Sequence, residues 1–194
     1  MATTVCASAA PTPSTAWASK SMERKRLGIG FVLALLVTAA DQASKAAILD
    51  VMRPPGVEGT PFLGQGMISV GPFLDLSLSW NSGVSFGLGN THGDWNVLLF
   101  TLLAAVVAAF LLRWMATSKG GILLAAQGFV LGGALGNVID RLHYGAVVDF
   151  LYVHVGAFDW WPNFNLADSA ICTGAALMVF DSLFAERLSH KNRP

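Results

Sequence analysis

Three aspartates of this chain, Asp140, Asp149 and Asp168, lie among apolar neighbours beside segments hydrophobic enough to span a bilayer. They fall in the stretch from Asn137 to Asp168, which is also rich in asparagine. A carboxylate is costly in such surroundings, so a functional role is its default interpretation. The stretch is therefore the candidate active site.

Two carboxylates brought together at low dielectric can perform the chemistry of an aspartic protease. One acts as general base on a water molecule that attacks a carbonyl, while the other, protonated, polarises that carbonyl and later donates to the leaving amine. The two share a proton because like charges a few ångströms apart resist double ionisation. The chain shows no Ser/His or Cys/His arrangement for nucleophilic catalysis. Its four histidines have no metal-ligand spacing, so we expect no metal and no cofactor.

Each polar residue also has a structural interpretation. Asp41 and Lys45 lie four residues apart on one helical face. They form either an ion pair that makes a buried charge tolerable or a pair that orients substrate, and the sequence leaves both open. Asp140 directly precedes Arg141 and shares a helical face with Asn137, which favours a structural hydrogen-bond network.

The other two aspartates differ in their local surroundings. Asp149 lies between Val148 and Phe150 and has no basic neighbour in sequence, so desolvation should favour its protonated form. Asp168 would begin a helix, where the helix dipole favours an acid. Asn165, three residues earlier, is a natural cap for that helix.

The composition identifies an integral membrane protein. Hydrophobic residues make up 54% of the chain and charged residues 12%, about half the charged fraction of a soluble domain. The basic residues are too scattered to follow a phosphate backbone, which excludes nucleic-acid binding. Cys6 lies in a polar tail and Cys172 in an apolar run, so we expect both to be free thiols.

Four apolar segments are long enough to cross a bilayer. They cover residues 27–48, 95–112, 121–139 and 168–184. Residues 1–21, rich in Ala, Ser, Thr and Pro, are expected to form a disordered cytoplasmic tail. Residues 22–188 then form one membrane domain, and residues 189–194 form a C-terminal tail. Either Met1 or Met22 can be the start.

The distribution of Lys and Arg predicts the orientation. Four spans place both termini on one side, and nine of the 12 basic residues fall on that side. Both termini are therefore expected in the cytoplasm. The aspartate-rich stretch and the long loop after the first span then share the outer face.

That loop contains a short amphipathic strand. Leu74, Leu76, Leu78 and Trp80 alternate with polar residues, a pattern typical of a strand with one apolar face. The expected fold is a membrane α-helical protein of four transmembrane helices, with a small β-sheet on the outer-face loop. In the third span Gly128, Gly132 and Gly136 recur every four residues and should allow close helix packing.

Five blocks of sequence, in order, resemble the motifs of bacterial lipoprotein signal peptidase, or signal peptidase II. They are DQASK at 41–45, NSGVSFGLG at 81–89, GGALGNVIDR at 132–141, VVDF at 147–150 and FNLADSAICTGAAL at 164–177. The resemblance implies an intramembrane aspartic peptidase whose catalytic pair is Asp149 and Asp168. It also implies a set of substrate-binding and supporting residues: Asp41, Lys45, Asn81, Gly83, Gly133, Asn137, Asp140, Arg141, Asn165 and Ala167.

The same resemblance implies a substrate and a location. The substrates would be prolipoproteins carrying a diacylglyceryl cysteine, cut just before that cysteine, and the enzyme would be a target of globomycin. It would sit among the lipids of the bacterial cytoplasmic (inner) membrane with no obligate protein partner. A transporter or channel subunit is the rival class, but it predicts an inverted repeat and carboxylates spread through the membrane thickness. A purely structural scaffold would leave the cluster of acids and asparagines unexplained.

Overall fold

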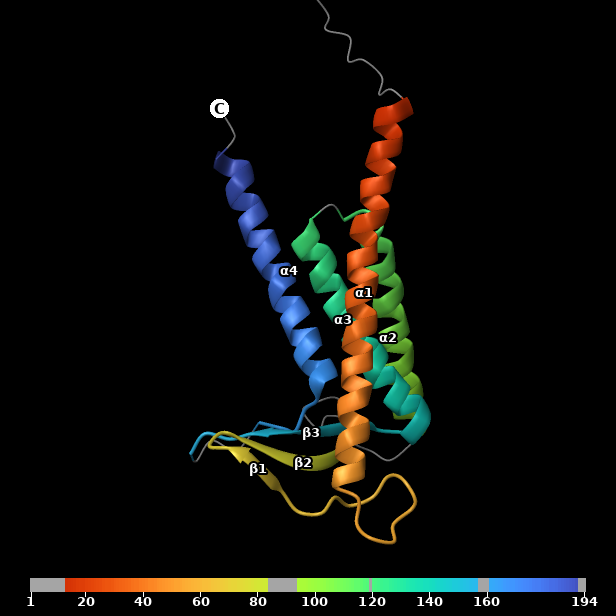
Figure 1. Ribbon diagram of the computed structural model, residues 1–194, viewed down its shortest axis with the longest axis vertical. Coiled ribbons are helices and arrows are strands. Elements are labelled where there is room, and N and C mark those ends of the chain that lie inside the picture. Colours follow the sequence, from red (N-terminus) through yellow and green to blue (C-terminus); the bar gives the residue numbers. More distant parts are fainter. Residues whose placement is uncertain (1–12, 84–93, 119, 157–160, 192–194) are drawn as a thin grey trace, which may run out of the picture.

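The computed structural model describes residues 13–83, 94–118, 120–156 and 161–191, and, except at residue 94, the side chains from residue 27 to residue 184 within those ranges. They form four helices and three strands (Figure 1). The helices are α1 (Pro13–Val51), α2 (Asp94–Met115), α3 (Gly121–Tyr144) and α4 (Leu166–Lys191). The strands are β1 (Ile68–Gly71), β2 (Leu74–Asn81) and β3 (Val147–Val153).

Each helix contains a segment long and apolar enough to cross a membrane. These segments are Leu27–Val51, Trp95–Met115, Gly121–Tyr144 and Leu166–Phe184. The four predicted transmembrane helices are therefore confirmed, with ends that differ by a few residues. The predicted ends stop with the apolar run, whereas α1 continues to Val51 and α3 continues through Asp140 and Arg141 to Tyr144.

The expectation of a disordered tail over residues 1–21 is wrong for residues 13–21, which belong to α1. The segment from Thr15 to Arg26 is rich in Ala, Lys, Glu, Met and Arg, which are good helix formers. Extending an existing helix avoids the cost of nucleating a new one, so the helix of the first span extends toward the N-terminus through this segment. Residues 1–12 lie outside the described residues.

Helix α3 is the centre of the bundle and contacts α1, α2 and α4. Its glycines allow these close approaches: a Cβ at Gly128 would meet the Gly30 carbonyl oxygen of α1, and a Cβ at Gly132 would lie 2.6 Å from the Ala34 oxygen. The Thr38 hydroxyl also donates to the Gly132 oxygen at 2.9 Å. The predicted packing role of these glycines is thus confirmed.

The three strands form one antiparallel sheet in the order β1-β2-β3. Strand β2 was predicted from its alternation, but β3 was not predicted. Its Val-rich sequence VVDFLYV is nevertheless typical of a strand. The register places Asp149 of β3 opposite Ser79 of β2.

The start of α1 and the end of α4 lie at one end of the molecule, and the sheet lies at the other (Figure 1). A core cluster joins the last turns of α1 to the sheet through Ile48, Leu49, Met52, Val148 and Phe150. The indole of Trp80 donates to the Phe62 carbonyl at 2.7 Å, which ties the intervening loop to β2. The sheet is therefore held firmly against the helix ends that carry the polar residues.

Candidate active site

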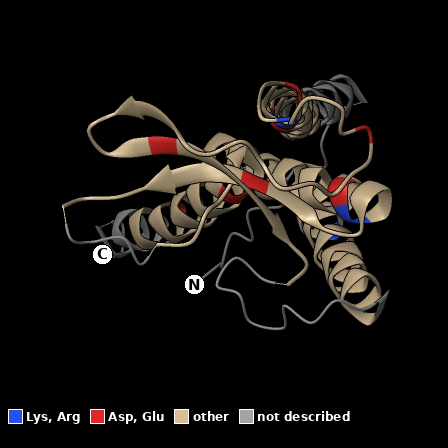
Figure 2. Cartoon of the chain, turned by 90° about the horizontal axis from the view of Figure 1, so that it is seen from below, with Lys and Arg blue, Asp and Glu red and all other residues tan. Residues whose placement is uncertain are grey.

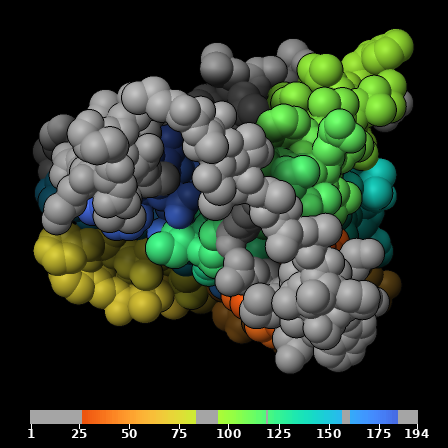
Figure 3. All heavy atoms as spheres, turned by 90° about the horizontal axis from the view of Figure 1, so that it is seen from above, coloured from red at the N-terminus to blue at the C-terminus, as the bar shows by residue number. Residues whose placement is uncertain are grey.

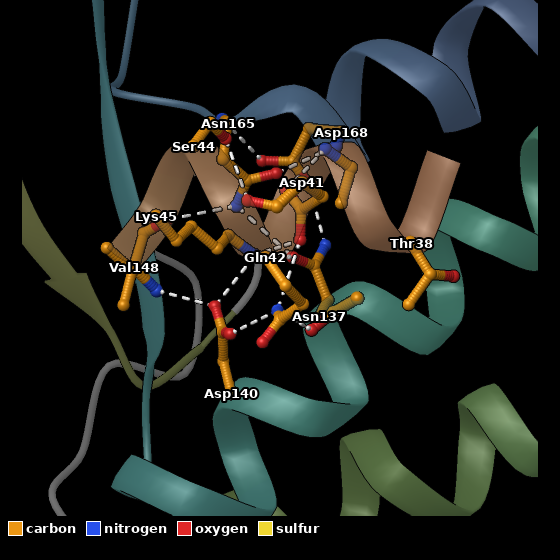
Figure 4. Close-up of polar contacts among 12 residues, drawn as sticks. Thr38, Asp41, Gln42, Ser44, Lys45, Asn137, Asp140, Val148, Asn165 and Asp168 are labelled. Carbon is orange, nitrogen blue, oxygen red and sulfur yellow. Dashed lines mark hydrogen bonds and ion pairs between the residues drawn. The ribbon is translucent and has the colours of Figure 1, made fainter. Parts of the chain in front are cut away.

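A buried ion-pair cluster lies between α1 and α3 (Figure 4). The ammonium of Lys45 lies 2.7 Å from a carboxylate oxygen of Asp41 and 2.7 Å from one of Asp140. All three side chains are fully or almost fully buried. Buried charges are tolerable only when paired and hydrogen-bonded, and this cluster satisfies both conditions.

Further hydrogen bonds complete the cluster. Asp140 accepts from Gln42 at 2.8 Å and from the Val148 N–H at 3.0 Å, and Asp41 accepts from the Ala167 N–H at 2.9 Å. The cluster therefore joins α1 and α3 to the starts of β3 and α4. Gln42 was not among the sequence candidates, although it lies in the DQASK block beside Asp41.

The cation that pairs with Asp140 is Lys45, rather than the adjacent Arg141 inferred from sequence. Consecutive residues of a helix point about 100° apart, so Arg141 projects elsewhere. It donates to the Gly83 carbonyl at 2.9 Å, and its guanidinium lies 5.1 Å from the centre of the Phe100 ring. The structural network predicted around Asp140 is thus present, but with a different cation.

Asp149 is carried by β3 and is only 1% exposed. Its two carboxylate oxygens accept from amide groups of Asn165 at 2.7 Å and Asn81 at 3.0 Å. Burial raises the pKa of Asp149 to about 7, and the charge of Asp168 acts in the same direction, while the hydrogen bond from Asn81 opposes them. Asp149 can therefore hold a proton at neutral pH.

Asp168 lies in the first turn of α4. The side chain of Asn165 accepts from the Asp168 N–H at 2.9 Å, and the Asn165 N–H donates back to the Asp168 carboxylate at 3.4 Å. This reciprocal arrangement is a capping box and confirms that Asn165 caps α4. The other oxygen of the Asp168 carboxylate accepts from Asn137 at 2.8 Å.

Two asparagines connect the aspartates to each other and to the ion-pair cluster. The Asn165 amide that donates to Asp149 also lies 3.1 Å from the Asn137 oxygen. That same oxygen accepts from Lys45 at 3.2 Å. With its oxygen held by Lys45, Asn137 must turn its NH₂ group toward Asp168. The buried cation thereby sets the orientation of an amide that contacts a carboxylate of the pair.

Two cavities border Asp168. One, of about 270 Å³, has Asn81, Asn137, Arg141 and Asp168 as its polar lining and apolar walls from α2, α3 and α4. The other, of about 510 Å³, is mainly apolar and lies between Val153, the segment from Trp161 to Phe164 and the first turns of α4. Asp168 thus contributes to the lining of both cavities. Within the described ranges no group of three or more His, Cys, Asp or Glu is placed to hold a metal ion.

Residues 33–184 match the family model described as Signal peptidase (SPase) II. This chain belongs to the signal peptidase II family. It is a membrane peptidase with four transmembrane helices and a small antiparallel sheet.

Sequence similarity to named lipoprotein signal peptidases supports that assignment. The chain is 42% identical over 161 residues to the lipoprotein signal peptidase of Methylocella silvestris, a match that covers 82% of this chain and 88% of that protein. It is 43% identical over 154 residues to the lipoprotein signal peptidase of Paraburkholderia phymatum, covering 78% and 85% respectively. Among solved structures, a bacterial membrane enzyme determined by the in meso method is similar with a TM-score of 0.68 and 25% identity. That match covers 86% of this chain and 94% of the other.

The fold of this signal peptidase brings the motif residues together at one end of the bundle. Gly83 donates its N–H to the Asn81 side chain at 3.0 Å, and Gly133 leaves room for the Ala167 carbonyl of α4. Every candidate residue from the sequence lies within this connected network. The remainder of the NSGVSFGLG block, residues 84–89, lies outside the described residues.

Proposed function

We propose that Asp149 and Asp168 are the catalytic dyad of a peptidase that removes signal peptides from prolipoproteins. The observation that carries the proposal is the link through Asn165, whose side-chain amide donates to the Asp149 carboxylate and whose backbone N–H donates to the Asp168 carboxylate. The elevated pKa of Asp149, about 7, supports an acid role for this residue. By contrast, the carboxylate of Asp140 is occupied by Lys45, Gln42 and the Val148 N–H.

In the proposed reaction Asp168 is the base and Asp149 the acid. Asp168 takes a proton from a water molecule whose oxygen forms a bond to the scissile carbonyl carbon. Asp149 donates its proton to the carbonyl oxygen, so that a neutral tetrahedral diol forms. Asp168 then passes its proton to the peptide nitrogen, and Asp149 takes a proton back from one hydroxyl of the diol. The C–N bond breaks, which releases the signal peptide as a carboxylic acid and the mature protein as an amine and returns both aspartates to their starting forms.

The amide groups hold both carboxylates in place during these transfers. Asn81 and Asn165 direct N–H groups at Asp149, and Asn137 directs one at Asp168. Arg141 lines the smaller cavity, and among the described residues its Nε has no hydrogen-bond partner. Because Arg141 borders this cavity, its guanidinium is the proposed donor to a carbonyl of the substrate backbone.

The substrate class follows from the family and from the shape of the site. We propose a diacylglyceryl-modified cysteine immediately after the scissile bond. The two cavities beside Asp168 are both lined largely by apolar side chains, which suits an apolar signal peptide and acyl chains. The lipid would hold the scissile bond at the depth of the carboxylates, near the outer face of the bacterial inner membrane, with both termini in the cytoplasm.

The test is cleavage of a purified prolipoprotein with and without its diacylglyceryl group. The purified protein should convert the modified form to a smaller product whose new N-terminus is the lipid-bearing cysteine, and should leave the unmodified form intact. Cleavage at another bond would contradict the proposed specificity. Equal cleavage of both forms would contradict the role of the lipid.

A further inference from the structure

The guanidinium of Arg141 has two kinds of partner. One of its NH₂ groups donates to the Gly83 carbonyl at 2.9 Å, and the other reaches the Asn137 carbonyl only at 3.5 Å, which is a weak contact. Its Cζ atom lies over the Phe100 ring, 5.1 Å from the ring centre. This distance is within the range of a cation–π interaction, about 6 Å. An aromatic ring of α2 therefore lies against a cation that lines the cavity beside Asp168.

The Nε–H group of Arg141 makes this ring more important. Its nitrogen is buried and has no hydrogen-bond partner among the residues that the structure describes. A buried donor without an acceptor is costly, and the electron-rich face of an aromatic ring is a weak acceptor for N–H groups. A cation–π interaction is also stronger where the cation is desolvated. The Phe100 ring therefore stabilises this guanidinium more than a ring at an exposed site would.

Phe100 also links α2 to the site. Helix α2 packs against α3, and α4 lies on the other side of α3 (Figure 1 and Figure 3). The side chains of α2 that line the smaller cavity recur at helical spacing on one face of the helix: Phe100, Leu103, Ala104 and Val107. Three of them are aliphatic and form an apolar wall, whereas the aromatic ring of Phe100 can also stabilise a cation.

The orientation of the guanidinium matters because an arginine side chain is flexible. Fixing it removes much rotamer freedom, so a substrate that had to fix it would bind less tightly. The Gly83 carbonyl holds one edge of the planar group, and the Phe100 ring covers its face. The group is thus already oriented when a substrate carbonyl arrives. Figure 2 shows few Lys and Arg residues at the sheet end of the molecule, which makes the placement of each one more important.

We propose that Phe100 is a positioning residue for substrate binding. Its ring holds the Arg141 guanidinium in the orientation that donates to a carbonyl of the substrate backbone, so Phe100 acts through Arg141. The inference rests on the proposed function, in which Arg141 is that donor. It adds α2 (Asp94–Met115) to the elements that form the site, although none of the candidate residues from the sequence lies on this helix.

Steady-state kinetics of Phe100→Leu on a diacylglyceryl-modified prolipoprotein test the proposal. Leu keeps apolar bulk but has no π face, so KM should rise about tenfold while kcat stays close to that of the parent chain. Phe100→Tyr, which keeps the ring, should retain the parent KM. Phe110→Leu is the matched control, because Phe110 lies on the same helix, is 61% exposed and has the Trp114 ring as its neighbour. It should leave both constants unchanged.

A double-mutant cycle tests whether Phe100 acts through Arg141. Binding of the lipid-modified prolipoprotein is measured in detergent with chains that carry Asp149→Asn, so that the substrate is not cleaved. These chains also carry Phe100→Leu, Arg141→Gln or both. Gln is neutral and leaves no cation for the ring to hold. Phe100→Leu alone should weaken binding about tenfold, and it should have little further effect in the chain with Arg141→Gln.

Two results would overturn the inference. One is an unchanged KM in Phe100→Leu, or a rise in Phe100→Tyr as large as in Phe100→Leu. The other is an equal loss of binding from Phe100→Leu with and without Arg141→Gln, which would make Phe100 an independent wall of the cavity. Phe100→Met takes the place of Phe100→Leu if the thermal midpoint shows that the Leu variant does not fold. Failure of the parent chain to cleave the substrate would instead contradict the proposed function itself.

Discussion

At the scale of single residues, the two carboxylates of the proposed dyad differ in their partners. Asp149 is buried and receives amide donors on both oxygens, whereas Asp168 is half-buried, borders two cavities and is held by its own helix cap. The same side-chain type thus occupies two environments, which is the usual way to separate an acid from a base.

Replacing either member of the dyad by Asn should abolish cleavage while leaving the fold intact. Asn keeps the shape of Asp but cannot carry the proton, so we expect Asp149→Asn and Asp168→Asn each to lower the cleavage rate by about 10²- to 10⁴-fold. Both variants should still bind lipid-modified substrate. Steady-state rates and binding assays in detergent measure the two quantities separately.

Asp140→Asn is the matched control, because Asp140 lies in the same network. It should reduce stability by about 3 kcal/mol or more, since it removes one carboxylate from the buried Lys45. The fraction that remains folded should retain activity. A folded but inactive Asp140→Asn, together with an active Asp149→Asn, would mean that the dyad is Asp140 with Asp168.

The raised pKa of Asp149 predicts the pH dependence of cleavage. With a pKa of about 7, its acid form is lost above neutral pH, so kcat/KM should fall about tenfold per pH unit there. Asn81→Leu removes a hydrogen bond that lowers this pKa, so the fall should begin at higher pH. An unchanged profile, or one moved to lower pH, would contradict the acid role.

The same group also makes stability depend on pH. Its pKa rises from 3.8 in the unfolded chain to about 7 in the folded protein, so the folded state binds the proton more tightly. Its contribution to the free energy of unfolding is therefore lost progressively as pH rises from about 4 to about 7.

At the scale of elements, α3 positions the site because it packs closely against both α1 and α4. Gly132→Ala should lower the thermal midpoint, since its Cβ would lie 2.6 Å from the Ala34 backbone oxygen and force the helices apart. Gly121→Ala, at the first residue of the same helix, meets open space and should not lower the midpoint, because the added Cβ displaces nothing and Ala favours a helix over Gly. Equal effects of the two substitutions would argue against close packing of α3.

At the scale of the whole molecule, the distribution of Lys and Arg predicts how the protein sits in the membrane. Single cysteines introduced at Lys20 and Lys191 in the chain lacking Cys6 and Cys172 should not react with an impermeant thiol reagent in intact spheroplasts. A cysteine at Glu58, which is exposed in the loop after α1, should react. Labelling at either terminal position would contradict the predicted orientation.

Much of this protein could be predicted from local sequence. The four helices follow from the length and hydropathy of their segments, and β2 follows from its alternation, because both patterns depend on neighbours within a few residues. The aspartates could be selected in the same way, since a carboxylate in an apolar segment is unusual on its own, whereas the supporting residues followed from the resemblance to the family. The Asn165 cap was also predictable, because capping is local.

The tertiary structure decided which of these residues meet. Lys45 pairs with Asp140, although the two lie 95 positions apart in the chain. The adjacent Arg141 does not, because neighbours on a helix point in different directions. Strand β3 has a local signal in its Val-rich sequence, but only its pairing with β2 brings Asn81 to Asp149. Helix direction and strand register are set by packing between distant segments. A local pattern therefore identified the polar residues, but only the folded chain assigned their partners.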